Sequence, residues 1–186
     1  MRLFLAITPD ESCRVALARD VAPLREEVTG VRWVRDEHVH ATLFFLGEVD
    51  EGRRSALARA VGPVVAGHPS FMAHLAGGGA FPNWRRPRIA WIGFLDPEPV
   101  GRLAADVVRA CGALGFQSSR DFQPHVTLGR VTRALASSER ARLEEGLLAL
   151  TGPYPFAVPR VEVVHSKLHA GGPRHSVIEG WPLGPA

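Results

Sequence analysis

The chain has 186 residues, of which 46% are hydrophobic and 22% are charged, and its formal net charge is +3. These values are typical of a globular chain that can bury one sizeable core or two small lobes, and they exclude a disordered or fibrous protein. No segment approaches the roughly 20 apolar residues of a membrane span, and the apolar run at residues 3–7 is too short for the core of a signal peptide.

Cysteine and lysine usage give two further indications. Cys13 and Cys111 lie in predicted helices without the spacing of a metal site, so we expect buried free thiols in a reducing cytoplasm. Lys167 is the only lysine among 22 basic residues. Arginine can hold a phosphate through two parallel hydrogen bonds, but a GC-rich genome, which favours Arg, Ala, Gly and Pro together, explains the total better. Only individual positions can therefore indicate phosphate binding.

The first half of the chain predicts alternating strands and helices. In order, they are a strand at 2–7, a helix from about 11 to 27, strands at 31–35 and 39–46, a helix at about 51–66 and a strand at about 71–75. Thr8 and Glu11 resemble a capping box with Pro9 at the first helical position. Pro23 is expected to kink that helix or end it early.

The second half repeats this order after a Gly- and Arg-rich connection at 77–88. The expected elements are a strand at 89–94, a helix from about 98 to 114, a strand at 124–131, a helix from Ser137 or Ser138 to about 150, and a hairpin of strands at about 160–169 and 174–181 that turns at Gly171 and Gly172. Asp96 and Pro97 begin the first of these helices, much as Thr8 and Pro9 do in the first half.

Matching spacings indicate an internal duplication. Leu3 to His40 spans 37 residues and Ile89 to His125 spans 36. We therefore expect an α+β fold in which residues 1–186 form a single bilobed domain, with the second half starting near residue 88. Each of its two lobes, related by a pseudo-twofold axis, would have an antiparallel sheet with flanking helices, and a cleft would lie between the lobes.

One pattern occurs in both halves, 85 residues apart: His40-Ala41-Thr42-Leu43 and His125-Val126-Thr127-Leu128. Alternate residues of a strand face the same side, so each histidine shares a face with its threonine. A single histidine on an apolar strand is ordinarily a satisfied core or edge residue. Two copies at equivalent places instead indicate a functional site shared by two strands.

Two histidines and two threonines suit acid–base chemistry on a phosphate. At neutral pH one imidazole can be neutral and remove a proton from water, while the other is protonated and delivers a proton to the departing oxygen. The threonine hydroxyls can donate hydrogen bonds to the non-bridging oxygens, where negative charge develops. This scheme needs no metal and no other cofactor.

Runs across nearly the whole chain carry a family resemblance, at residues 2–7, 32–34, 40–49, 81–82, 85–88, 124–131, 166–168 and 171–172. They resemble the 2H phosphoesterases, and among these the RNA 2′,3′-cyclic phosphodiesterases, also called 2′-5′ RNA ligases. The resemblance implies hydrolysis of RNA 2′,3′-cyclic phosphate ends to 2′-phosphates without a metal, with reversible ligation also permitted. The implied partner is an RNA or oligonucleotide with such an end, and we expect a cytoplasmic monomer that needs no membrane.

The resemblance also implies a role for each site residue. His40 would donate a proton to the leaving 3′ oxygen, and His125 would accept a proton from water. Thr42 and Thr127 would hold the phosphate oxygens. Arg130 resembles a basic position near the phosphate site, although strand alternation places it on the face opposite His125 unless a bulge intervenes.

Several points stay open. Phe44, where relatives often have lysine, shares the face of His40 by alternation and could either stack on a base or pack in the core. His38 could line the site or lie in an exposed turn, and the loop at 84–88 could contact RNA or only solvent. Alternative functions are a zinc hydrolase using His38, His40 and His125, a nucleotide- or RNA-binding module without turnover, and a hydrolase of another cyclic phosphate.

Overall fold

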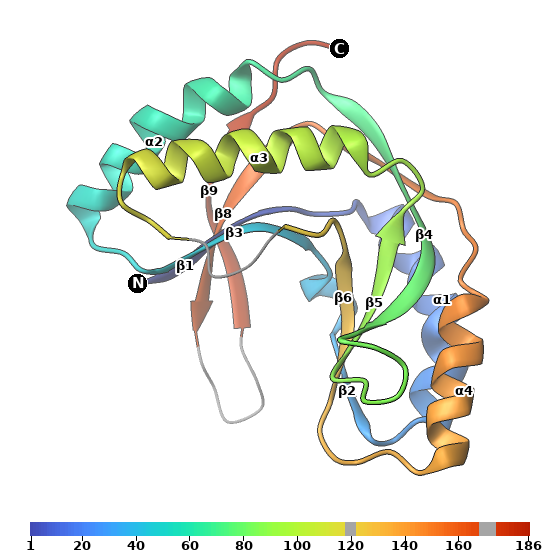
Figure 1. Cartoon of the computed structure of the whole chain (residues 1–186). Coiled ribbons are helices and arrows are strands. Elements are labelled where there is room, and N and C mark those ends of the chain that lie inside the picture. Colours follow the sequence, from blue (N-terminus) through green and yellow to red (C-terminus); the bar gives the residue numbers. More distant parts are fainter. Residues whose placement is uncertain (118–121, 168–173) are drawn as a thin grey trace.

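Two antiparallel sheets, each covered by a pair of helices, make up two lobes (Figure 1). The computed structural model describes residues 1–117, 122–167 and 174–186. Within these residues it has an α+β architecture, as predicted.

The first lobe has a four-stranded sheet in the order β3-β1-β8-β9, with α2 and α3 side by side over one face. Its elements are β1 (Arg2–Ile7), β3 (Ala41–Glu48), α2 (Glu51–Ala66), α3 (Glu98–Ala113), β8 (Arg160–Lys167) and β9 (Arg174–Pro182). Strands β8 and β9 pair as the expected hairpin. Its predicted turn at Gly171 and Gly172 lies outside the described residues.

The second lobe has a five-stranded sheet in the order β2-β6-β5-β4-β7, with α1 and α4 packed together beside it. Its elements are α1 (Glu11–Glu27), β2 (Val31–Trp33), β4 (Phe71–Phe81), β5 (Ile89–Phe94), β6 (Val126–Val131), α4 (Ser137–Leu148) and β7 (Tyr154–Val158), and a single 3₁₀ turn, η1 (Asp36–His38), follows β2. The sequence did not predict β7, although Tyr154, Phe156 and Val158 are buried in alternation, as an edge strand requires.

The two lobes are not the two halves of the chain. Helix α1 follows β1 of the first lobe but packs against β7 and α4 of the second, while α3 follows β5 of the second lobe and packs against β3 and α2 of the first. Strand β4 likewise comes from the first half and pairs in the second lobe. If the second half of the chain repeats the first, β3 corresponds to β6 and β1 to β5. The strand order β3-β1-β8 of one sheet then corresponds to the order β6-β5-β4 of the other. Each lobe is therefore built from both halves of the chain, which exchange helices and strands.

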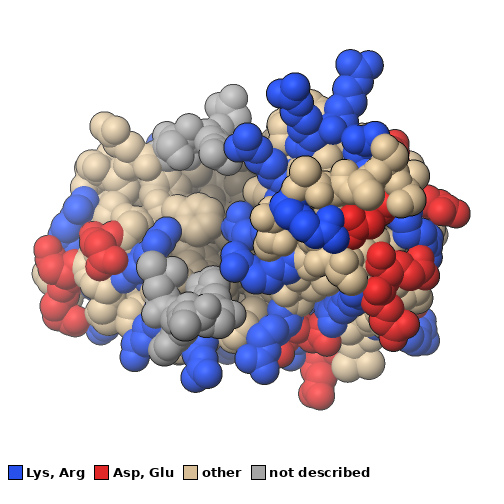
Figure 2. Space-filling view, turned by 90° about the horizontal axis from the view of Figure 1, so that it is seen from below, with Lys and Arg blue, Asp and Glu red and all other residues tan. Residues whose placement is uncertain are grey.

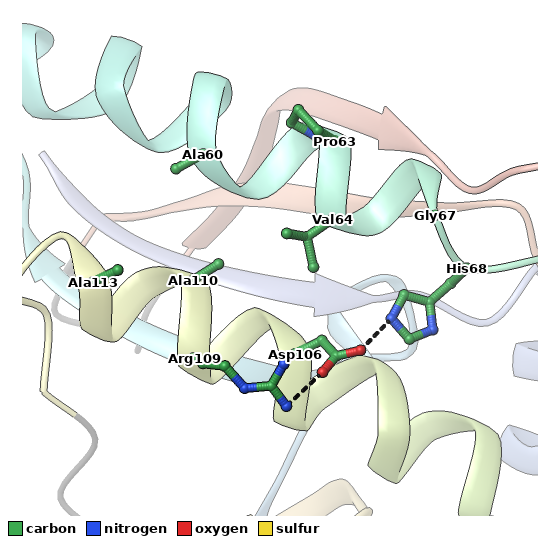
Figure 3. A pocket seen from close by; sticks show the side chains of 9 residues that line it. All are labelled: Ala60, Pro63, Val64, Gly67, His68, Asp106, Arg109, Ala110 and Ala113. Carbon is green, nitrogen blue, oxygen red and sulfur yellow. Dashed lines mark hydrogen bonds and ion pairs between the residues drawn. The ribbon is translucent and has the colours of Figure 1, made fainter.

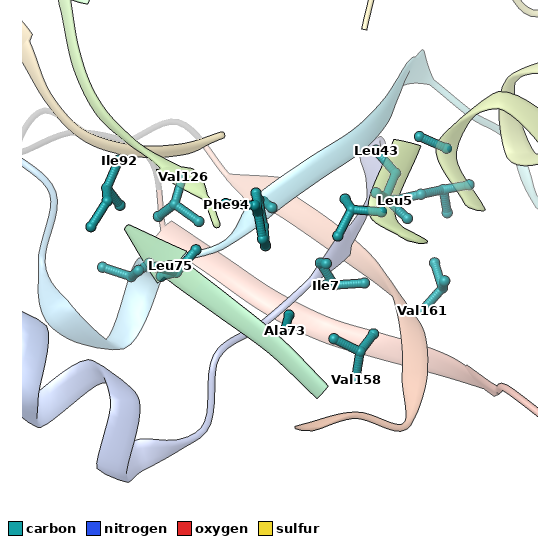
Figure 4. Packing of buried hydrophobic residues seen from close by; sticks show 14 of the residues in the cluster. Leu5, Ile7, Leu43, Ala73, Leu75, Ile92, Phe94, Val126, Val158 and Val161 are labelled. Carbon is teal, nitrogen blue, oxygen red and sulfur yellow. The ribbon is translucent and has the colours of Figure 1, made fainter. Parts of the chain in front are cut away.

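Buried apolar side chains form a large cluster that includes residues of both sheets (Figure 4). Leu5 and Ile7 of β1 belong to it together with Ile92 of β5 and Val126 of β6. A small separate cluster of Phe4, Ala6 and Val164 lies on the opposite face of the first sheet. Strand β1 thus buries one face in the main core and the other in this small cluster, whose Phe4 also lines a cavity.

The start of α1 differs from the sequence expectation. Asp10, rather than Thr8, caps the helix, since its carboxylate accepts a hydrogen bond from the Cys13 amide at 2.9 Å. The Thr8 hydroxyl instead donates to the buried Glu162 carboxylate at 2.7 Å. The helix also continues through Pro23 to Glu27. Asp50 caps α2, since its carboxylate accepts a hydrogen bond from the Arg53 amide at 2.8 Å.

Both cysteines are buried free thiols, as predicted. Across the part of the chain that the structure describes, no helix combines the length and apolar character needed to cross a membrane.

Candidate active site

The two motif histidines lie at matching places, one in each lobe. His40 directly precedes β3 and His125 directly precedes β6, so each strand begins later than the expected 39 and 124. Although β3 and β6 belong to different sheets, they contact each other. The fold therefore brings the two strands that follow the motif histidines into contact.

Each imidazole is held by the same backbone hydrogen bond. His40 Nδ1 lies 2.7 Å from the carbonyl oxygen of His38, and His125 Nδ1 lies 2.7 Å from that of Gln123. A carbonyl oxygen can only accept, so Nδ1 carries the proton in both rings. In the neutral rings Nε2 is then left as a proton acceptor for chemistry.

Both motif strands contain a bulge after the threonine. In the pairing of β3 with β1, Thr42 lies opposite Ala6 and Phe44 opposite Leu5, so Leu43 has no partner. In the pairing of β6 with β5, Thr127 lies opposite Trp91 and Gly129 opposite Ala90, which leaves Leu128 unpaired in the same way. A bulge reverses the alternation beyond it.

The bulge in β6 decides the position of Arg130. Regular alternation would place Arg130 on the face opposite Thr127, but with Leu128 as an extra residue the two share a face. Both side chains line a cavity of about 300 Å³, together with His40. Of the predicted site residues, Thr42 on β3 and His125 just before β6 lie outside this lining.

The bulge in β3 exchanges the expected positions of two phenylalanines. Phe44 is only 3% exposed and packs in the core, whereas Phe45 is 64% exposed and lines the cavity. Core packing is therefore the correct interpretation of Phe44. The possibility of stacking on a base passes to Phe45, five residues after His40, just as Arg130 lies five residues after His125.

This exchange predicts opposite effects of two neighbouring substitutions. Phe44→Ala is expected to lower the free energy of unfolding by about 3–5 kcal/mol, since it leaves a cavity in the core. Phe45→Ala should change it by less than about 1 kcal/mol, because the ring is largely in water. Urea denaturation of both variants tests this, and equal losses would contradict the bulge.

Aromatic rings surround each histidine. The ring of Phe4 stacks on His40 with centroids 4.8 Å apart, and the ring of Phe81 meets His125 edge-on at 5.0 Å. The ring centroid of His175 on β9 lies 5.1 Å from that of His40 and 5.3 Å from that of His38. His38 also lines the cavity, so it borders the site rather than lying in an exposed turn. Nothing in the sequence pattern pointed to His175, which reaches the site only through strand pairing.

Burial lowers the pKa of both imidazoles. The pKa of His40 falls to about 4, mainly through loss of hydration; the hydrogen bond to His38 opposes this, and the charges of His175, His38 and His125 add to it. Loss of hydration also lowers the pKa of His125, against its bond to Gln123, and the Arg130 charge lowers it further. Both rings are therefore neutral at neutral pH when nothing is bound.

The hollowed face of the molecule is rich in arginine. Figure 2 shows blue side chains around the central hollow and red ones toward both ends. The lining of the cavity contains four arginines: Arg2, Arg32, Arg35 and Arg130. The loop at 84–88 contributes none of them; Trp84 packs partly on the core, and Asn83 accepts hydrogen bonds from the Arg85 and Arg86 amides at 3.1 Å.

No group of three or more His, Cys, Asp or Glu side chains within the described residues is placed to hold a metal ion. The zinc-hydrolase alternative, with His38, His40 and His125, therefore has no ligand set there.

A second hollow, of about 650 Å³, lies between α2 and α3 (Figure 3). Small apolar side chains line most of it, and Asp106 accepts from His68 at 3.0 Å and pairs with Arg109 at 2.8 Å. It contains none of the predicted site residues.

A family model described as LigT-like phosphoesterase matches residues 7–91 and 95–175, which include both histidine motifs. The chain belongs to this family. The LigT-like phosphoesterases form part of the 2H group that the motifs resemble, so the family expectation is confirmed.

Named relatives and solved structures agree with this assignment. The RNA 2′,3′-cyclic phosphodiesterase of Methanothermobacter thermautotrophicus is 31% identical over 98% of this chain and 99% of its own length. That of Thermotoga maritima is 32% identical over 96% and 93%. Crystal structures of Thermus thermophilus TT0787 and of Escherichia coli LigT complexed with 3′-AMP both superpose with a TM-score of 0.80, at 26% and 27% identity. They cover 100% and 98% of this phosphoesterase, and 99% and 97% of their own chains.

Proposed function

We propose that this protein hydrolyses RNA 2′,3′-cyclic phosphate ends to 2′-phosphates, using His40 as acid and His125 as base and no metal ion. The observation that supports this most directly is the matched pair of imidazoles, each with Nδ1 bonded to the carbonyl two residues earlier. Relatives that match nearly the whole chain are named RNA 2′,3′-cyclic phosphodiesterases, which supports the choice of substrate.

In the proposed reaction a water molecule attacks phosphorus opposite the 3′ oxygen. Nε2 of His125 takes a proton from the water as its oxygen bonds to phosphorus. The bond from phosphorus to the 3′ oxygen breaks, and Nε2 of His40 delivers a proton to that oxygen. The product has a 3′-hydroxyl and a 2′-phosphate.

The proton that His40 donates must be gained when substrate binds. With a pKa of about 4, His40 is neutral in the free protein at neutral pH. A cyclic phosphate brings a negative charge next to the ring, and a neighbouring negative charge raises an imidazole pKa. Substrate binding thus helps to protonate the acid that acts on it.

The remaining side chains would stabilise the charge that develops on the phosphate. Thr42 and Thr127 can each donate a hydroxyl hydrogen bond to a non-bridging oxygen. Arg130, on the cavity face beside Thr127, can add a charge-assisted hydrogen bond. Phe45 would form an apolar wall for the sugar or base.

The competing functions are separated by one assay. We expect an oligonucleotide with a 2′,3′-cyclic phosphate end to be converted to a 2′-monophosphate at the same rate with and without excess EDTA. Identification of the product isomer by chromatography completes the test.

A rate abolished by EDTA and restored by zinc would support the metal hydrolase. Binding without conversion would support the nucleotide- or RNA-binding module. Conversion of other cyclic nucleotide phosphates, but not of RNA ends, would indicate a different substrate within the family. Formation of a 2′-5′ linkage after addition of a 5′-hydroxyl strand would reveal the reverse ligation.

A further inference from the structure

Two arginines stand directly opposite each other at the edge of the second sheet. Arg32 of β2 pairs with Arg130 of β6 in the antiparallel register, so both side chains project to the same side. Both line the cavity that contains His40. Like charges placed directly opposite on neighbouring strands destabilise a sheet, so an anion bound between or beside the two guanidinium groups would stabilise this arrangement.

Neither guanidinium is neutralised within the described residues. Nearby arginines do find carboxylates there, since Arg25 pairs with Asp36 and Arg35 with Glu37. Arg32 and Arg130 form no such pair in that part of the chain. Arg2, which reaches the same cavity from β1 of the other lobe, forms none there either.

The positive charge of the arginines that line the cavity exceeds the negative charge of one reacting phosphate. A cyclic phosphate has a single negative charge, and Arg130 is the arginine on the same strand as Thr127. The cavity of about 300 Å³ lies at the small end of ligand sites, with room for about one nucleotide. A phosphate linking that nucleotide to the preceding one would therefore lie at the rim, where Arg32 is exposed.

We propose that Arg32, with Arg2 in the same cavity lining, binds the internucleotide phosphate immediately upstream of the reacting one. The aromatic side chains of Phe45 and Trp33 line the same cavity. This is the combination that single-stranded nucleic acid requires of its binding groove. The inference rests on the proposed function and adds that the enzyme prefers strand ends to free cyclic nucleotides.

Three substrates test the upstream site. They are adenosine 2′,3′-cyclic phosphate, the adenosine dinucleotide with the same cyclic end, and that dinucleotide with an uncharged methylphosphonate link. We expect kcat/KM to be about tenfold higher for the charged dinucleotide than for the mononucleotide, chiefly through KM. The uncharged link should lose most of this advantage.

Substitution locates the contact. In Arg32→Gln the ratio of kcat/KM between the charged dinucleotide and the mononucleotide should fall toward one, and Arg32→Lys should restore part of it. Arg102→Gln on α3 is the matched control, because that exposed arginine lies outside the cavity and should leave the ratio unaltered. Circular dichroism confirms that each variant is folded.

Salt dependence gives an independent measure. The slope of log kcat/KM against log salt concentration should be steeper by about 0.7 for the charged dinucleotide than for the mononucleotide, as expected for one further phosphate contact. In Arg32→Gln the two slopes should coincide.

Equal kcat/KM on all three substrates would overturn the upstream site while leaving the proposed function intact. An advantage that persists with the uncharged link, or in Arg32→Gln, would overturn it as well, because the contact would then not be with the phosphate charge. Failure to hydrolyse any of the three would instead refute the proposed function.

Discussion

His40→Ala and His125→Ala are each expected to lower kcat/KM on a 2′,3′-cyclic phosphate end by about 10²–10⁴-fold, the usual contribution of a general acid or base. The loss should appear mainly in kcat, because each proton transfer occurs in the transition state. Steady-state kinetics on a short oligonucleotide with a cyclic end measures both values.

The variant that combines His40→Ala with His125→Ala tests whether the two histidines act in the same step. If the two histidines act in one concerted displacement, the combined loss should be much smaller than the product of the single losses. His68→Ala is the matched control, since His68 lies between α2 and α3, away from the cavity. Turnover at the wild-type rate in either single variant would refute the two-histidine mechanism.

The pH dependence of kcat/KM should be bell-shaped with its maximum below pH 6.5, the ordinary imidazole pKa. The free protein is active when His40 is protonated and His125 is neutral, and burial lowers the pKa of both rings, that of His40 to about 4. Raising the pH removes the proton from His40, so kcat/KM should fall about tenfold per unit above neutrality.

The profile of kcat should lie at higher pH than that of kcat/KM. It reports the bound complex, in which the negative phosphate raises both imidazole pKa values. Measuring both profiles between about pH 4 and pH 9 separates the two states. A kcat/KM that stays flat from neutral to alkaline pH would show that no buried imidazole supplies the proton.

The orientation of the side chains that follow each histidine motif depends on a bulge in the strand, which regular alternation does not predict. Period-two alternation puts each histidine on the same face as its threonine, but it also puts Phe44 in the cleft and Arg130 behind the sheet. The unpaired Leu43 reverses the orientation of Phe44, and the unpaired Leu128 reverses that of Arg130. No propensity distinguishes a leucine in a bulge from a leucine in a regular strand, so only the pairing partner reveals it.

The sequence pattern likewise could not predict which of the two sheets each helix or strand would join. Local patterns do predict α1 and β4, but which sheet each joins depends on contacts between residues far apart in the chain. The internal duplication from near residue 88 stays a prediction, now with the matching strand orders β3-β1-β8 and β6-β5-β4 in its favour.

By itself, the sequence determined the α+β class, most helices and strands, the family and the paired motifs, because hydrophobic periodicity, capping residues and a repeated pattern are all local signals. Only the tertiary structure decided that His175, Arg2 and Arg32 reach the cavity and that burial suppresses the charge of His40. These properties arise from strand register and from the exclusion of water, which depend on residues brought together by the fold.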